Sequence, residues 1–273
     1  MNLIEVVARR TKQAFRLSDD SRFVCAIRPR YDSVLQYFYG RTGLLRTIHG
    51  ERPIRLHPCA RLIREEYEPP VFSLLKQTIK PGFVILDVGA NIGVLTIFMA
   101  RWSEPGGHVH AFEPHPTANE ALIKHVCMNR LSSSVTVRAS ALSDIEGITA
   151  FYAAKGSHHS SLSDINVGPD AEQIRVPVTT IDAYCRLLGI KPSLIKIDVE
   201  GLEFSVLAGA RNTLRECRPL VIVELHPLIW PVLAIDAHVA IGQLAELHYS
   251  VTAIEKQFDM FSEYGHIMLA PIQ

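Results

Sequence analysis

The chain has 273 residues and carries 28 Lys and Arg side chains against 28 Asp and Glu, so its formal net charge is zero. Hydrophobic residues make up 48% and charged residues 21%, as in globular proteins and unlike disordered or fibrous ones. A neutral chain lacks the basic field with which proteins hold nucleic acid, so we expect no nucleic-acid partner.

The first 64 residues differ in charge from the rest of the chain. They contain 13 Lys and Arg against 5 Asp and Glu, whereas residues 65–273 contain 15 against 23. We interpret residues 1–64 as a basic N-terminal extension, beginning with an amphipathic helix, that packs on a domain spanning residues 65–273. The charge has two open interpretations, a basic arm for an anionic partner and a solvated basic face.

Several patterns bear on where the protein works. The longest apolar stretch, residues 83–100, is interrupted by Asp87 and Asn91, so we expect no membrane span. The N-terminus has no apolar core followed by a small-residue cleavage site. The five cysteines are widely spaced and include no C-x-x-C pair, which argues against a disulfide scaffold or a zinc knuckle. These patterns favour the cytoplasm.

From residue 84 onward, strand-like and helix-like segments alternate. Strands are expected at 84–88, 108–113, 135–140, 194–200, 220–226, 249–255 and 266–270, and helices at 92–101, 114–130, 204–217 and 236–248. This rhythm predicts an α/β fold with a doubly wound, mostly parallel sheet covered by helices on both faces. Residues 148–154 and 174–181 are interpreted as an inserted β-hairpin that flanks a loop at 156–168, and residues 156–163 of this loop as a candidate lid.

A glycine-containing turn follows the first of these strands. Ligands of open α/β sheets bind beyond the carboxyl ends of the strands, and glycine lets the backbone approach them closely. A dinucleotide site uses G-x-G-x-x-G, but here the spacing is G-x-N-x-G and Asp87 would repel a pyrophosphate. S-adenosylmethionine has no phosphate and carries an ammonium and a sulfonium. Glu113, 24 residues after Gly89, is placed to accept hydrogen bonds from both hydroxyls of its ribose.

Ionisable side chains also follow the two strands near 194–200 and 220–226. Asp198, Glu200, Glu224 and His226, together with Lys196, either form a structural salt-bridge network or surround a reacting hydroxyl. Removal of a hydroxyl proton needs a base; His226 has the best unperturbed pKa, and Asp198 or Glu200 can serve if desolvated. These four residues can also hold a divalent cation, but no tight ligand spacing demands one, and we expect no metal.

Four motifs resemble those of FkbM-type S-adenosylmethionine-dependent methyltransferases. They are D-V-G-A-N-I-G (87–93), A-F-E-P-H-P (111–116), A-L-S-D-x-E-G (141–147) and I-K-I-D-V-E-G-L-E-x-x-V-L-x-G-A (195–210). The stretch Tyr67-Glu68-Pro69 is similar too, and the resemblance covers roughly residues 65–226. It implies the class I methyltransferase fold, a Rossmann-like seven-stranded sheet with a reversed last hairpin. It also implies O-methylation of small molecules, often of sugars or polyketides.

The resemblance further implies which residues hold S-adenosylmethionine. Its methionine end would be wrapped by Asp87, Gly89, Ala90, Asn91 and Gly93. Glu113 would hold the ribose, and the adenine would lie near Pro114, Ser140 and Ala141, with Asp144 either reaching its amine or serving only as a turn residue.

The leading hypothesis is therefore a methyltransferase that acts on a hydroxylated small molecule such as a sugar, a glycan, a polyketide or a lipid-linked intermediate. The base would be among Asp198, Glu200, Glu224 and His226, with His226 first and Asp198 second. Two alternatives are an NAD-dependent oxidoreductase on a similar sheet and a non-catalytic cofactor-binding subunit. Neutral charge and the absence of an N/D-P-P-Y/F tetrapeptide at Asp198 disfavour nucleic-acid or protein methylation.

Overall fold

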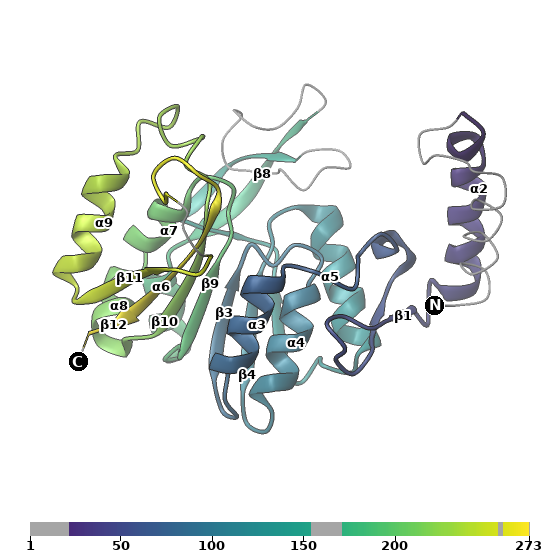
Figure 1. Cartoon of the computed structure of the whole chain (residues 1–273), viewed down its shortest axis with the longest axis horizontal. Coiled ribbons are helices and arrows are strands. Elements are labelled where there is room, and N and C mark those ends of the chain that lie inside the picture. Colours follow the sequence, from purple (N-terminus) through teal and green to yellow (C-terminus); the bar gives the residue numbers. More distant parts are fainter. Residues whose placement is uncertain (1–21, 154–170, 256–258, 273) are drawn as a thin grey trace.

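A computed structural model describes residues 22–153, 171–255 and 259–272. The helix expected at the start of the chain and the loop at 156–168 lie outside these ranges. The described residues form one central sheet with helices on both faces (Figure 1). No helix among them is both long enough and apolar enough to cross a membrane.

The central sheet has seven strands in the order β11-β12-β10-β9-β3-β4-β5. Their bounds are β3 Val84–Val88, β4 His108–Phe112, β5 Val135–Arg138, β9 Leu194–Ile197, β10 Leu220–Leu225, β11 Tyr249–Ala253 and β12 Gly265–Pro271. Strand β3 pairs in parallel with both β4 and β9, and only β12 runs antiparallel to its neighbours β10 and β11. This confirms the predicted doubly wound α/β sheet with a reversed last hairpin.

Both faces of the sheet are buried under helices, which explains the apolar run of β3. Ile85 packs into one core with helices α3 (Pro69–Thr78), α4 (Val94–Ser103) and α5 (Pro116–Met128). Its neighbour Leu86 points to the other face. There it packs with α6 (Ile181–Leu188), α7 (Glu203–Ala208), α8 (Arg211–Cys217) and the start of α9 (Ala237–Glu246).

Two predicted elements differ from the structure. The helix expected over 204–217 is split into α7 and α8, because Gly209 lies against the backbone of Ser143. A Cβ at Gly209 would be 2.0 Å from the Ser143 carbonyl oxygen. The strand expected over 194–200 ends at Ile197, so Asp198 and Glu200 lie in the turn after β9 instead of alternating along a strand. Glu200 has a left-handed backbone there, with φ of 54°.

The predicted insertion is also present. Strands β7 (Gly147–Ala153) and β8 (Glu172–Thr179) pair antiparallel, which confirms the expected hairpin. A short strand, β6 (Ala141–Leu142), joins them by pairing in parallel with β8. The result is a separate three-stranded sheet beside the main one.

The segment before α3 contains helix α2 (Arg22–Tyr39), strands β1 (Leu44–Arg46) and β2 (Ile54–Leu56), and the 3-10 helix η1 (Pro58–Ala60). Helix α2 lies apart from the sheet at one end of the molecule (Figure 1). In contrast, Ile48, Ile54 and Leu56 are fully buried in the core that contains α4. The domain boundary at residue 64 stays a prediction, but residues on both sides of it share this core.

Candidate active site

A cavity of about 900 Å³ lies at the carboxyl ends of β3, β4, β9 and β10. The chain adds β4 and β5 on one side of β3 and later adds β9 and β10 on its other side. The boundary between β3 and β9 is therefore the switch point at which open α/β sheets bind ligands. Five main segments line the cavity, and they lie within residues 59–68, 87–95, 112–121, 196–202 and 224–229.

The turn after β3 lies against the turn after β9. The backbone N–H groups of Gly89 and Ala90 both donate to the Phe112 carbonyl oxygen at 3.0 Å. Gly89 has φ of 76°, and a Cβ there would lie 1.7 Å from the Asp198 carbonyl oxygen. No side chain fits in that space, so this position requires glycine, and the two turns lie in direct contact.

Glu113 is buried at the end of β4 and holds this turn in place. Its Oε2 accepts from the Asn91 N–H at 2.7 Å, and its Oε1 accepts from the His115 N–H at 2.8 Å. Burial raises the pKa of Glu113 to about 7 even though these two N–H groups lower it. Each carboxylate oxygen can accept a second hydrogen bond, so Glu113 can still bind a diol.

Asp87 places a carboxylate with one unsatisfied oxygen beside the same turn. Only 1% of the residue is exposed. Its Oδ2 accepts from the Thr96 hydroxyl at 2.6 Å, whereas its buried Oδ1 has no hydrogen-bond partner within the described ranges. Burial raises the pKa of Asp87, and the nearby Lys196 charge opposes that rise. Because a buried unsatisfied acceptor is costly, this oxygen is suited to a ligand that donates hydrogen bonds or carries a positive charge.

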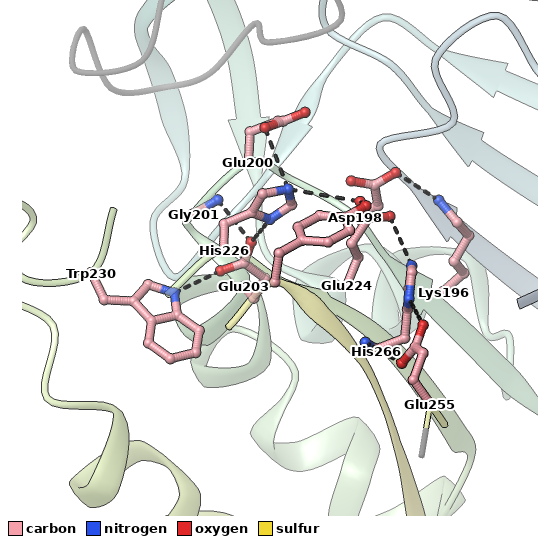
Figure 2. Close-up of polar contacts among 11 residues, drawn as sticks. Lys196, Asp198, Glu200, Gly201, Glu203, Glu224, His226, Trp230, Glu255 and His266 are labelled. Carbon is pink, nitrogen blue, oxygen red and sulfur yellow. Dashed lines mark hydrogen bonds and ion pairs between the residues drawn. The ribbon is translucent and has the colours of Figure 1, made fainter. Parts of the chain in front are cut away.

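The other half of the cavity contains a buried ion pair. Lys196 Nζ donates to Asp198 Oδ2 at 3.1 Å, and both side chains line the cavity (Figure 2). Burial, together with the charges of Glu224 and Glu68, raises the pKa of Asp198 to about 7, although Lys196 lowers it. Asp198 is therefore poised to gain or lose a proton near neutral pH.

His226 follows β10 and is held by a residue that the sequence analysis did not single out. Its Nδ1 lies 2.7 Å from Oε1 of Glu203, which is fully buried at the start of α7 (Figure 2). Its Nε2 lies 3.4 Å from Glu200 Oε2 and 3.8 Å from Glu224 Oε1. Burial lowers the pKa of His226, but the carboxylates of Glu203 and Glu200 outweigh it and raise the pKa to about 9. His226 is therefore cationic at neutral pH.

Glu224, near the end of β10, connects this network to residues of β12 and the segment before it. Its carboxylate accepts from the Tyr264 hydroxyl and lies 3.3 Å from His266 Nε2, and His266 in turn contacts Glu255 (Figure 2). Burial alone would raise the pKa of Glu224, but His266, Lys196 and Tyr264 lower it to about 2. The ionisable groups thus form a salt-bridged network, as one of the two interpretations proposed, and Asp198, Glu200, Glu224 and His226 also line the cavity. That they surround a reacting hydroxyl stays a prediction.

Asp198, Glu224 and His226 are close enough to share a metal ion, since one potential ligand atom from each lies within 4.8 Å of the others. Their charges fit such an ion poorly. Lys196 already pairs with Asp198, and His226 must lose its proton to bind a metal. The expectation that the protein uses no metal stays a prediction.

Most of the predicted site residues lie together. Those that line the cavity are Asp87, Gly89, Ala90, Asn91, Glu113, Pro114, Ser140, Ala141, Asp198, Glu200, Glu224 and His226. Gly93 lies behind the wall, where it precedes α4 with φ of 83°. Asp144 is exposed outside the cavity and accepts from the Ser143 hydroxyl at 3.0 Å, as a turn residue does. Glu68, Lys196 and Tyr264 line the cavity too; the sequence analysis placed Lys196 among the ionisable groups but gave no site role to Glu68 or Tyr264.

Two known proteins are similar to this chain in sequence. The chain is 29% identical over 215 residues to the 31-O-demethyl-FK506 methyltransferase FkbM of Streptomyces tacrolimicus, covering 67% of this chain and 78% of that protein. It is 30% identical over 174 residues to the hexuronic acid methyltransferase AglP of Haloferax volcanii, covering 60% of this chain and 64% of that protein, slightly less than two thirds of its length.

Among solved structures, the crystal structure of methyltransferase FkbM from Methylobacillus flagellatus KT aligns with a TM-score of 0.47 and 14% identity. The alignment covers 74% of this chain and 58% of that one. The family model described as the methyltransferase FkbM domain matches residues 87–259, a range that includes the glycine turn, Glu113 and the ionisable network. The chain belongs to the FkbM methyltransferase family.

Proposed function

We propose that this protein binds S-adenosyl-L-methionine and transfers its methyl group to a hydroxyl oxygen of a small molecule. The observation that carries the proposal is the buried Oδ1 of Asp87, which lies beside a glycine turn and has no hydrogen-bond partner among the residues that the structure describes. A carboxylate there repels the pyrophosphate of a dinucleotide but suits the ammonium of a methionine group.

The described residues fit this cofactor along the cavity. Asp87 would accept from the ammonium, and Gly89 leaves room for close approach to the backbone. Glu113 would accept from the ribose, because each of its oxygens keeps a free lone pair. Pro114, Ser140 and Ala141 line the region left for the adenine. When bound, S-adenosyl-L-methionine supplies a methyl group on a cationic sulfur; the methyl passes to the acceptor oxygen as its bond to sulfur breaks.

The chain must also remove the proton of the acceptor hydroxyl as its oxygen attacks the methyl group. A base works best when its pKa is near the working pH. Asp198, with a pKa of about 7, meets this condition and lies at the switch point. With a pKa of about 9, His226 is neutral in roughly one molecule in a hundred at pH 7. Glu224, with a pKa of about 2, is too weak a base. We therefore place Asp198 ahead of His226 as the base, and a carboxylate oxygen of Asp198 would take the proton.

Two relatives support a small-molecule acceptor. One is a 31-O-demethyl-FK506 methyltransferase and the other a hexuronic acid methyltransferase. On this basis we propose that the acceptor oxygen belongs to a sugar or a polyketide.

Calorimetry tests the cofactor. We expect the protein to bind S-adenosylhomocysteine and not NAD, and Asp87→Asn to weaken that binding by about tenfold or more, as loss of a charge-assisted hydrogen bond does. Asp236→Asn is the matched control, because Asp236 is exposed at the start of α9 and Asn caps a helix equally well. Binding of NAD without any response to S-adenosylhomocysteine would refute the proposal. Transfer of labelled methyl to a panel of hydroxylated compounds, read by mass spectrometry, then tests the reaction.

A further inference from the structure

Glu68 has a strained backbone at the edge of the cavity. It precedes α3 with φ of 43° and ψ of 60°, the left-handed conformation that residues other than glycine rarely adopt. The residue that follows is Pro69, and a residue before proline normally prefers an extended backbone. The Glu68 carbonyl oxygen accepts from the Phe72 N–H of α3 at 2.9 Å, but the Glu68 side chain makes no capping hydrogen bond to this helix. Such strain is typical of functional sites.

Neighbouring residues fix the segment that carries Glu68. His49 holds it at two points, because its Nε2 lies 2.7 Å from the Tyr67 carbonyl oxygen and its backbone N–H donates to the Glu65 carbonyl oxygen at 2.9 Å. Tyr67 is half-buried against the core that contains α4. The backbone can therefore maintain the strained conformation at Glu68 and keep its side chain at the cavity wall.

The Glu68 carboxylate has an oxygen available for a ligand. Its Oε2 is buried and makes no hydrogen bond to any residue that the structure describes. Glu68 lines the same cavity as Lys196, Asp198 and Tyr264. Its charge adds to the effect of burial in raising the pKa of Asp198, so the two carboxylates are close enough to interact.

The surrounding charges indicate what kind of ligand fits. This half of the cavity presents four carboxylates, those of Glu68, Asp198, Glu200 and Glu224, and two cations, Lys196 and His226. Lys196 already donates to Asp198, and no arginine lines the cavity in the described part of the chain. Anionic ligands are usually held by arginine or lysine. This half of the cavity therefore suits an uncharged ligand that donates hydrogen bonds.

We infer that Glu68 is an acceptor-binding residue: its Oε2 accepts a hydrogen bond from a hydroxyl of an uncharged, polyhydroxylated acceptor. Glu68, Asp198 and Glu224 together exclude acceptors that carry a carboxylate. In this respect the chain would differ from its relative that methylates a hexuronic acid. The inference rests on the proposed function, in which the acceptor occupies this half of the cavity.

Two glycosides that differ in one group test the acceptor class. The probes are methyl glucoside and methyl glucuronide, and the readout is binding to the protein loaded with S-adenosylhomocysteine, measured by NMR at millimolar concentrations. We expect the glucoside to bind and the glucuronide to bind at least about tenfold more weakly. Equal binding, preference for the glucuronide or binding of neither would overturn the inference. Failure of S-adenosylhomocysteine to bind would instead refute the proposed function, so the two failures are distinguishable.

Three variants test Glu68 itself. Glu68→Gln, which keeps the shape and removes the charge, should weaken glucoside binding by about tenfold and leave the Kd for S-adenosylhomocysteine within about twofold. Glu68→Gly, which relieves the left-handed strain, should raise Tm and still weaken glucoside binding. Glu66→Gln is the control, because Glu66 is exposed and outside the cavity wall. Unchanged glucoside binding in both Glu68 variants, or a loss confined to S-adenosylhomocysteine, would overturn the inference.

Discussion

Replacing Glu203 by Gln tests the charge that sets the protonation state of His226. Glu203 is fully buried and uses both carboxylate oxygens. Oε1 accepts from the Gly201 N–H at 2.7 Å and contacts His226 Nδ1, and Oε2 accepts from Trp230 Nε1 at 3.0 Å. Glutamine has nearly the same shape, but its NH₂ group must face one of these donors. The substitution therefore removes the charge and also leaves at least one buried donor unsatisfied.

The two consequences differ in their dependence on pH. The pKa of His226 rises from 6.5 to about 9, which corresponds to roughly 3 kcal/mol at about 1.4 kcal/mol per tenfold change in proton binding. Because the folded protein holds this proton more tightly, the stabilisation is fully present below pH 6.5 and is lost as pH rises through about 9. The unsatisfied donor costs about 1–3 kcal/mol at every pH.

Urea unfolding at about pH 6 and about pH 10 separates these effects. Between these values the wild type should lose more free energy of unfolding than Glu203→Gln, by an amount on the order of 3 kcal/mol, because Glu203 contributes the largest of the effects that raise the pKa of His226. Glu216→Gln, at an exposed position on α8, should behave as the wild type. An identical pH dependence of the wild type and Glu203→Gln would refute the assignment of His226 as a cation held by Glu203.

Three further predictions concern the cavity. Gly89→Ala should lower Tm and weaken S-adenosylhomocysteine binding by about tenfold or more in calorimetry, because a Cβ there would lie 1.7 Å from the Asp198 carbonyl oxygen; binding and stability equal to the wild type would contradict this contact. Asp198→Asn should lower kcat by about a hundredfold or more at saturating cofactor, and full activity of this variant in a labelled-methyl assay would exclude Asp198 as the base. The rate of the wild type should rise through about pH 7 as Asp198 ionises. A chelator should not change the rate, because Lys196 already neutralises Asp198; inhibition reversed by an added divalent cation would show a metal site instead.

The sheet was predictable because its strands are short apolar runs bounded by turn residues. The strand expected at 84–88 has those bounds in the structure, since both of its faces are buried and Gly82 and Gly89 flank it. The break between α7 and α8 was not predictable from local pattern. It depends on the contact of Gly209 with Ser143, which comes from a distant segment of the chain.

The positions of the site residues at one edge of the sheet were predictable from the sequence, but their charge states were not. The ends of parallel strands lie at one edge of a sheet, so Asp198 and His226 were expected to be near one another. Their pKa values depend on partners that a strand pattern does not reveal. Glu203 contacts His226 from the start of helix α7, and Lys196 in β9 donates to Asp198 in the turn that follows this strand. The left-handed backbone of Glu68 is likewise set by tertiary contacts and not by its own sequence.

The two halves of the cavity come from the chain in different ways. Asp87 and Glu113 belong to one short, continuous unit of strand, helix and strand, whereas the other half combines Tyr67 and Glu68 with the turns after β9 and β10. The two halves of the cavity meet where Gly89 contacts the Asp198 carbonyl oxygen. If the proposed function holds, chimeras that exchange residues 67–68 and 226–229 between relatives and keep this contact are predicted to change the acceptor and to leave the proposed methyl-donor site intact.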